Sequence, residues 1–234
     1  MEFIDYFDRV EIISLLERKD RRQDLARQIS KLGKSIDGDR IRFFDAIKPI
    51  NKGAFPSIGA RGCFESHLEV LRNASLDGIK NLLIIEDDIN FSDDINNISS
   101  FFYDLLNDSD WGFLYLGHVI NGIDKQQGNP QMLPVNHDTG VRCTHLIAIS
   151  GTTIPKLVEY LEAMYSRDAG DPAGGPMHVD GAYSWFRRET QCKTFVATPP
   201  IGYQRASRSD ITDGRLYDKL PFVKDIVNYI RKFK

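Results

Sequence analysis

The chain has 234 residues, of which 41% are hydrophobic and 27% are charged, and its formal net charge at pH 7 is -3. These values are typical of a soluble globular protein, and they favour one large domain over residues 1–234 rather than two small ones. A net charge this small excludes a global attraction to nucleic acid, so any binding of anions must depend on local clusters of basic residues.

The sequence carries no signal that would direct it into or across a membrane. No apolar run approaches the roughly 20 residues that are needed to span a bilayer. The N-terminus, MEFIDYFDRV, contains acidic residues and lacks the basic segment of a signal peptide. The three cysteines are widely spaced, which is typical of reduced thiols, and we therefore expect a cytoplasmic protein.

The first predicted elements are a strand and a helix joined by a charged turn. Residues 10–16 form an apolar run that predicts a buried strand. After the turn at residues 17–22, apolar residues at helical spacing predict a helix that Asp20 caps and Gly33 ends. A strand, a basic turn and a helix in this order are typical of a nucleotide-binding sheet.

The turn after this strand is rich in arginine and contains Arg18, Arg21 and Arg22. Because the turn follows the C-terminal end of a strand, where such sheets often hold phosphates, these side chains are candidates for binding a phosphate group. The alternative is a solvated basic face.

The rest of the chain alternates between strand-like and helical segments. Further strands are predicted within residues 40–46, 82–91, 111–117, 144–150 and 194–197. Helices are predicted from residue 63, after Ser92, and within residues 154–164 and 181–188, whereas loops are predicted at residues 48–62, 121–141 and 168–176. The last of these loops is either a lid over a site or a linker. The alternation predicts an α/β fold with three layers, in which helices cover both faces of the sheet.

An acidic triplet follows the apolar residues at 82–85. Glu86, Asp87 and Asp88 would lie at the C-terminal end of a buried strand, where open α/β sheets hold their ligands. Three neighbouring carboxylates repel one another unless a cation neutralises them, so this pattern indicates a hard-metal site. Solvated acids at a strand end are the alternative.

Other patterns predict no site. No GxGxxG follows the first strand, and Cys143 and His145 lack partners at the spacing of a structural zinc site. Ser66 and His67 are adjacent on a predicted helix, so they point about 100° apart and cannot act as nucleophile and base. We expect His67 to be a packed or hydrogen-bonding residue.

Three ordered motifs resemble glycosyltransferase family 25, which includes bacterial lipopolysaccharide galactosyltransferases and collagen galactosyltransferases. The motifs are ISLLERKDRR, GARGCFESHLEVLRNA and LLIIEDDINF, which together reach Phe91. The segments THLIAIS, HVDGAY and GYQRASRSDI extend the likeness weakly to Ile211. The resemblance implies a GT-A-type fold with a mostly parallel central sheet and an inverting transfer from a nucleotide sugar. UDP-galactose is the donor that the analogy implies, and a cell-surface glycan or lipopolysaccharide precursor is the acceptor.

The resemblance also implies roles for the motif residues. By that likeness Asp88 holds the metal ion, Mn²⁺ or Mg²⁺, which together with arginines would stabilise the charge that develops on the leaving diphosphate. The residues that would contact the nucleotide sugar are Arg18, Arg21, Arg22, Glu86 and Asp87.

Inversion in one displacement needs a carboxylate that removes the proton of the acceptor hydroxyl. Asp180, at the start of a late helix, is the first candidate, and a simple N-cap is its alternative role. Asp210 is the second candidate, as base or as an additional contact. The neighbouring residues that we expect to reach phosphate or acceptor are Gln204, Arg205, Ser207 and Arg208.

Residues 219–234 form a basic amphipathic segment. We expect a helix that either docks on an anionic membrane surface, near a lipid-linked acceptor, or packs on the core. Two other functions remain open from the sequence. One is a non-catalytic module that binds nucleotide sugars or glycans, and the other is a metal-dependent phosphate-ester hydrolase.

Overall fold

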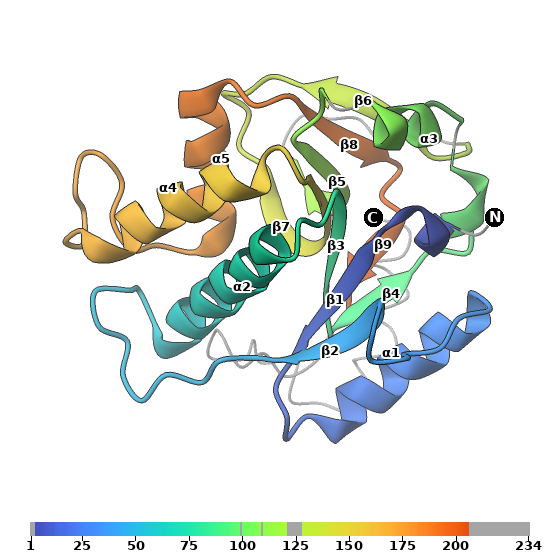
Figure 1. Cartoon of the computed structure of the whole chain (residues 1–234), viewed down its shortest axis with the longest axis horizontal. Helices are drawn as coiled ribbons and strands as arrows, with labels where there is room; N and C mark the ends of the chain where they lie inside the picture. The colour runs from blue at the N-terminus through green and yellow to red at the C-terminus, as the bar shows by residue number, and fades with distance from the viewer. Residues whose placement is uncertain (1–2, 99, 109, 121–127, 206–234) are drawn as a thin grey trace.

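A computed structural model of the chain describes residues 3–98, 100–108, 110–120 and 128–205 (Figure 1). They form a seven-stranded sheet with the order β2-β1-β3-β7-β5-β8-β6. The bounds are β1 Arg9–Ser14, β2 Ile41–Asp45, β3 Asn81–Glu86, β5 Phe113–Val119, β6 Gln131–Val135, β7 Arg142–Ser150 and β8 Thr194–Thr198. Within the described ranges β6 and β7 run opposite to the other five strands. The predicted α/β class with a mostly parallel sheet is therefore confirmed.

Strands β1 and β3 lie side by side in the interior of this sheet. They pair in parallel, with Val10 opposite Leu83 and Ile13 opposite Glu86. The four apolar residues of β3 at positions 82–85 have 0% exposure, because helices cover the sheet on both sides. This register brings the turn after β1 and the acids after β3 to the same edge of the sheet.

Helices cover both faces of the sheet and give three layers. Figure 1 shows α2 (Ile58–Leu76), α4 (Ile154–Ser166) and α5 (Val179–Thr190) on one side, with α1 (Lys19–Lys31) and α3 (Ser100–Asn107) on the other. Each side has its own apolar core, and leucines and phenylalanines of the helices meet the β-branched residues of the strands in both. The short elements are η1 (Phe3–Tyr6), η2 (Ile95–Asn97) and a two-stranded sheet of β4 (Ile89–Phe91) and β9 (Gly202–Gln204).

Two predicted helix starts were wrong. Helix α1 begins at Lys19, and the carboxylate of Asp20 accepts two hydrogen bonds from the Arg18 guanidinium instead of capping the helix. Helix α2 begins at Ile58 rather than at residue 63, because the Ser57 hydroxyl accepts a hydrogen bond from the Ala60 amide at 3.0 Å and caps the helix earlier.

Two other segments also differ from their predictions. The helix expected after Ser92 is divided into η2 and α3, with Ile98 in extended conformation between them. The loop expected at residues 121–141 contains strand β6, which pairs only with β8 in the described part of the chain. An edge strand tolerates Pro134, which had argued against a strand there.

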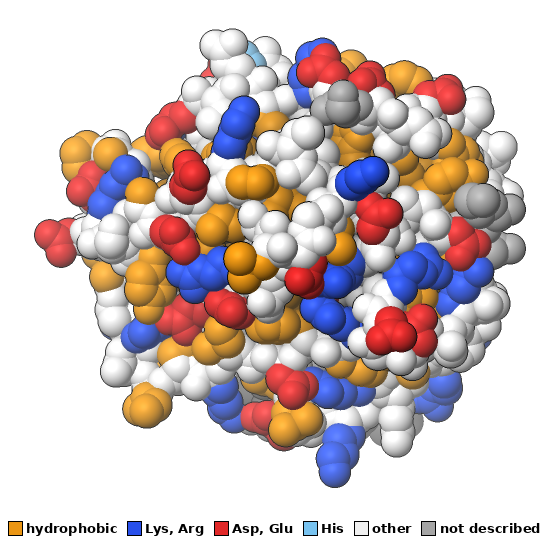
Figure 2. Space-filling view, viewed as in Figure 1, with side chains coloured by type: hydrophobic (Ala, Val, Ile, Leu, Met, Phe, Trp, Pro, Cys, Tyr) orange, Lys and Arg blue, Asp and Glu red, His pale blue; other side chains and the backbone are white. Residues whose placement is uncertain are grey.

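The described surface mixes charges of both signs. Figure 2 shows acidic, basic and hydrophobic side chains interspersed over one face of the molecule. None of the helices among the described residues is long and apolar enough to cross a bilayer. The amphipathic segment predicted at residues 219–234 lies outside the described residues.

Candidate functional site

A cavity of about 420 Å³ lies at the sheet edge where β1 and β3 end. The turn at residues 14–21 forms one wall, and residues 46–49 with the first turns of α2 form another. Its volume falls in the range of small-molecule sites, roughly 300–1,000 Å³. The predicted site residues that line this cavity are Arg18, Arg21, Glu86, Asp87, Asp88 and Gln204.

A second cavity, of about 130 Å³, adjoins the first. It is lined by residues from α2, β3, β7 and the start of α5, among them Thr144 and Asp180. Cys63, Glu86 and Gln204 line both cavities, so these side chains form the boundary between them. A ligand that passed Glu86 would therefore reach the carboxylate of Asp180.

The carboxylate of Asp87 is engaged in holding the first-strand turn. Its Oδ1 accepts a hydrogen bond from Arg21 Nη1 at 2.8 Å, and its Oδ2 accepts one from the Ser14 hydroxyl at 2.7 Å. Both partners of this ion pair are nearly buried, with side-chain exposures of 10% and 8%. Asp87 thus fixes the position of Arg21 at the cavity.

Asp88 differs from Asp87 in that only one of its carboxylate oxygens accepts a hydrogen bond within the described residues. Its Oδ2 accepts a hydrogen bond from Gln204 at 3.0 Å, while its buried Oδ1 has no hydrogen-bond partner among the described residues. Burial and the neighbouring Glu86 charge raise the pKa of Asp88 to about 6. An unsatisfied carboxylate oxygen beside other acids fits a hard divalent cation, which would supply the missing positive charge.

The pKa of Glu86 is shifted in the opposite direction, below its usual value. Burial alone would raise the pKa of Glu86, but His67 and the Thr144 hydroxyl, which donates to Oε1 at 2.7 Å, lower it. His67 lies with its Nε2 atom 3.6 Å from the same oxygen. The predicted role of His67 as a packed, hydrogen-bonding residue is confirmed, because it is fully buried and bonds to Tyr183 at 3.0 Å.

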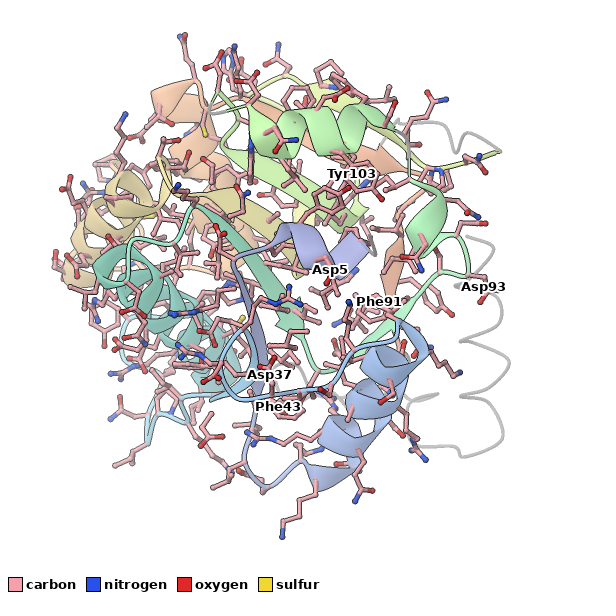
Figure 3. The ribbon with its side chains drawn as sticks, turned by 45° about the vertical axis from the view of Figure 1, so that its right-hand side comes forward. Asp5, Asp37, Phe43, Phe91, Asp93 and Tyr103 are labelled. Carbon is pink, nitrogen blue, oxygen red and sulfur yellow. The ribbon has the colours of Figure 1, made fainter. Side chains whose placement is uncertain are left out.

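Arg22 lies behind the turn and does not line either cavity. Its Nη2 donates to the Ser14 carbonyl at 2.8 Å, and its guanidinium stacks on the Phe43 ring at 4.8 Å from the centroid. Figure 3 shows Phe43 beside α1, the helix that carries Arg22. Lys48, which the sequence analysis missed, does line the large cavity and forms an ion pair with Glu17. A basic residue in a glycine- and proline-punctuated loop was the signal for it.

Asp180 is the second residue of α5 and not its cap. The N-cap residue is His178, so the N-cap alternative was wrong. Asp180 Oδ1 accepts a hydrogen bond from the Gly181 amide at 2.8 Å, and Oδ2 accepts one from the Cys143 amide at 3.3 Å. The backbone of Cys143 has a φ of 71°, a left-handed conformation that is uncommon for residues other than glycine and asparagine. The carboxylate is thereby held at the wall of the small cavity.

The strand β9 returns the chain to the acidic turn. The Arg205 guanidinium donates to the Asp87 carbonyl at 2.6 Å and to Asp24 at 3.0 Å, and its amide donates to the Asp88 carbonyl at 2.6 Å. Arg205 therefore supports the turn from outside the cavities. Ser207, Arg208 and Asp210 lie outside the described residues.

Comparisons with known proteins bear on the family and the fold of the chain. Residues 50–132 match glycosyltransferase family 25 (LPS biosynthesis protein), which confirms the predicted family resemblance and the predicted enzyme class, a glycosyltransferase. No curated protein sequence matches the chain significantly.

Solved structures resemble this chain at low sequence identity. A glycosyltransferase involved in the glycosylation of the major capsid of PBCV-1 is 10% identical, with a TM-score of 0.50. The alignment covers 84% of this chain and 93% of that chain. This likeness confirms a GT-A-like arrangement. A 4-diphosphocytidyl-2C-methyl-D-erythritol synthase from Anaerococcus prevotii is 11% identical, and the alignment covers 95% of this chain and 78% of that chain. A UDP-glucose pyrophosphorylase complexed with UDP-glucose is 12% identical, and the alignment covers 97% of this chain and 82% of that chain. Both of these have TM-scores of 0.43, below the level that indicates a shared fold.

Proposed function

We propose that this chain, whose residues 50–132 match glycosyltransferase family 25, is an inverting, metal-dependent enzyme that transfers a hexose from a nucleotide sugar. The donor is a UDP-hexose, with UDP-galactose the choice that the family favours, and the acceptor is a cell-surface glycan or lipopolysaccharide precursor. The observation that carries the proposal is the large cavity, in which the arginine turn faces an acidic triplet whose Asp88 has an unsatisfied buried oxygen.

The large cavity is the proposed donor site. Arg18, Arg21 and Lys48 line it and would bind the diphosphate through charge-assisted hydrogen bonds. Asp88 would hold Mn²⁺ or Mg²⁺, which when bound supplies positive charge to the leaving diphosphate. Arg21 and Ser14 each donate to one oxygen of Asp87, so this residue would fix Arg21, and its remaining lone pairs would contact the ribose or the donor sugar.

Glu86 and Asp180 are proposed to act on the sugar. Glu86 stays ionised at the boundary of the two cavities, where its free oxygen would accept a hydrogen bond from a donor hydroxyl. Asp180 would accept the proton of the acceptor hydroxyl in the small cavity. The acceptor oxygen then bonds to the anomeric carbon as the carbon–phosphate-oxygen bond breaks, and the nucleoside diphosphate leaves with that electron pair.

Gln204, Arg205 and Arg22, which the sequence predicted to contact phosphate, acceptor or nucleotide sugar, take supporting roles in this proposal. Gln204 positions Asp88, whereas Arg205 and Arg22 support the two turns from behind. Asp210 is the second candidate for the base, and Ser207 remains a candidate donor contact. A cytoplasmic location, with residues 219–234 docked on an anionic membrane face, is likewise a prediction.

A transfer assay with Asp180→Asn tests the proposal. Purified protein is incubated with UDP-galactose, Mn²⁺ and truncated lipooligosaccharides, while UDP release is measured and the product anomer is read by NMR. We expect a β-linked product, and a loss of at least about 100-fold in kcat for Asp180→Asn, since general base catalysis contributes roughly 10²–10⁴-fold. The exposed Asp39→Asn is the control and should keep full activity.

Three results would contradict parts of this account. Retention of the α configuration would refute inversion. Near-normal turnover by Asp180→Asn would move the base elsewhere, with Asp210→Asn as the next variant. Binding of donor without UDP release on any acceptor would support the non-catalytic module instead.

A further inference from the structure

A cluster of soft and nitrogen donor groups lies beside the acidic triplet. The Cys63 thiol, a ring nitrogen of His67 and a Glu86 oxygen all lie within 4.8 Å of one another. Cys63 and His67 are four residues apart on α2, so they share one face of the helix. Glu86 reaches them from the end of β3. Two different elements therefore deliver three groups that commonly bind metal ions.

His67 provides an independent sign of a missing ligand. It is completely buried, yet its Nε2 atom has no hydrogen-bond partner among the described residues. Its other ring nitrogen, Nδ1, lies 3.0 Å from the Tyr183 hydroxyl. Metal binding uses the tautomer in which Nδ1–H donates to the Tyr183 hydroxyl, so that Nε2 carries a lone pair rather than a proton directed at Glu86. A histidine whose second ring nitrogen is held by a hydrogen bond is the usual arrangement at a metal ion.

We propose that Cys63, His67 and Glu86 bind a thiophilic divalent cation of the Zn²⁺ class. Sulfur, imidazole and carboxylate together are a zinc donor set, whereas Mn²⁺ and Mg²⁺ prefer oxygen ligands such as Asp88. Tetrahedral zinc places a sulfur, a nitrogen and an oxygen ligand roughly 3.3–3.7 Å apart. His67 Nε2 and Glu86 Oε1 already lie 3.6 Å apart, so only the wider separations in the cluster must close, by about 1 Å. The small cavity adjoins Cys63 and Glu86 and leaves room for water as the fourth ligand. On binding, the thiol proton leaves to solvent.

The position of this site has a consequence that rests on the proposed function. Cys63 and Glu86 line both cavities, and Glu86 is a proposed donor contact. A cation bound there occupies the boundary between donor and acceptor. Zinc and donor are therefore expected to compete, and zinc to inhibit transfer even when Mn²⁺ is saturating.

Cobalt titration of the metal-free protein tests the site without any activity measurement. Co²⁺ is expected to give visible bands of tetrahedral cobalt and a near-ultraviolet thiolate-to-cobalt band, both saturating at one equivalent and removed by Zn²⁺. Cys63→Ser should abolish the thiolate band. His67→Gln should weaken binding by more than about 100-fold, since even loss of an outer-shell partner costs roughly 10–100-fold.

Matched variants separate this site from its neighbours. Cys143→Ser, which changes another thiol of the same cavity, and Asp88→Asn, which removes the hard-metal ligand, should both keep the cobalt spectrum. Tyr183→Phe should lower affinity about 10–100-fold with an unchanged circular dichroism spectrum, which keeps the test valid if Cys63→Ser fails to fold.

The site proposal is overturned if wild type gives no thiolate band, if the band survives in Cys63→Ser, or if Tyr183→Phe binds cobalt as well as wild type does. Failure of the donor proposal would look different, because Mn²⁺-dependent nucleotide binding would be absent while the cobalt spectrum remained.

Discussion

The substitution Asp88→Asn is expected to stabilise the metal-free protein while removing its proposed metal site. Folding raises the pKa of Asp88 from 3.8 to about 6, chiefly through burial. A carboxyl group with a raised pKa binds its proton more tightly in the folded state, so its favourable contribution to the free energy of unfolding is lost as pH rises through 6. At pH 7.5 the buried charge costs about 3 kcal/mol, and at pH 4 the cost falls below about 1 kcal/mol.

Asparagine keeps the shape of the side chain and an oxygen that can accept the Gln204 hydrogen bond. We expect a gain of about 1–3 kcal/mol at pH 7.5, below the full cost because the attraction of Arg21, 3.8 Å away, is also lost. Urea denaturation without metal at pH 7.5 and at pH 4 measures the difference. The gain should be small at pH 4, and added Mn²⁺ should stabilise wild type only.

Asp87→Asn is the matched control because it changes the adjacent acid. It breaks the buried pair with Arg21 and should destabilise the protein by about 3 kcal/mol at pH 7.5. Opposite signs for the two neighbours are the specific expectation. If Asp88→Asn is destabilising, or if its effect is the same at both pH values, then Asp88 is not a strained buried charge and the argument for a cation there fails.

Three further substitutions test how the site is built. Gly62→Ala would place a Cβ 2.6 Å from the Ile47 carbonyl oxygen, so we expect a loss of about 1–3 kcal/mol in urea unfolding and weaker nucleotide binding; unchanged values would refute the close contact. Arg187→Met leaves two loop carbonyls and a threonine hydroxyl without their buried donor and should lower the free energy of unfolding by about 3 kcal/mol, with a change under 1 kcal/mol as the contrary result. Thr144→Val removes the 2.7 Å hydrogen bond to Glu86, and it should raise the pKa of Glu86 and weaken donor binding at pH 5 more than at pH 8; equal weakening would contradict this.

The sequence was sufficient to predict the elements that form the proposed donor cavity. The apolar runs before Leu16 and Glu86 predicted buried strands, and the arginines and the acids were each predicted at the C-terminal end of a strand, where such sheets hold ligands. The apolar runs and the charged residues that follow them can both be read from short, continuous segments of the sequence. Tertiary structure then brought Arg18 and Arg21 to the cavity together with the acids.

The sequence could not distinguish the neighbouring acids from each other. Asp87 and Asp88 have nearly the same local context, yet Arg21 and Ser14 satisfy one while the other keeps an unpaired oxygen. That difference depends on side-chain geometry across two strands. The positions of Thr144 and Cys143 beside the acids depend on β7, which pairs antiparallel to β3 and has no signal for its direction in the sequence.

Nucleotide binding by wild type and Asp88→Asn is the most direct test of a metal-dependent donor site at Asp88. Melting temperatures are measured with UDP, GDP or CDP, each with and without Mn²⁺. One nucleotide, expected to be UDP, should stabilise wild type only when Mn²⁺ is present, by about 2.7 kcal/mol at a concentration 100 times its Kd. Asp88→Asn should show no such metal-dependent shift. If none of the three nucleotides stabilises wild type with Mn²⁺, or if Asp88→Asn responds as wild type does, the proposed donor site is contradicted.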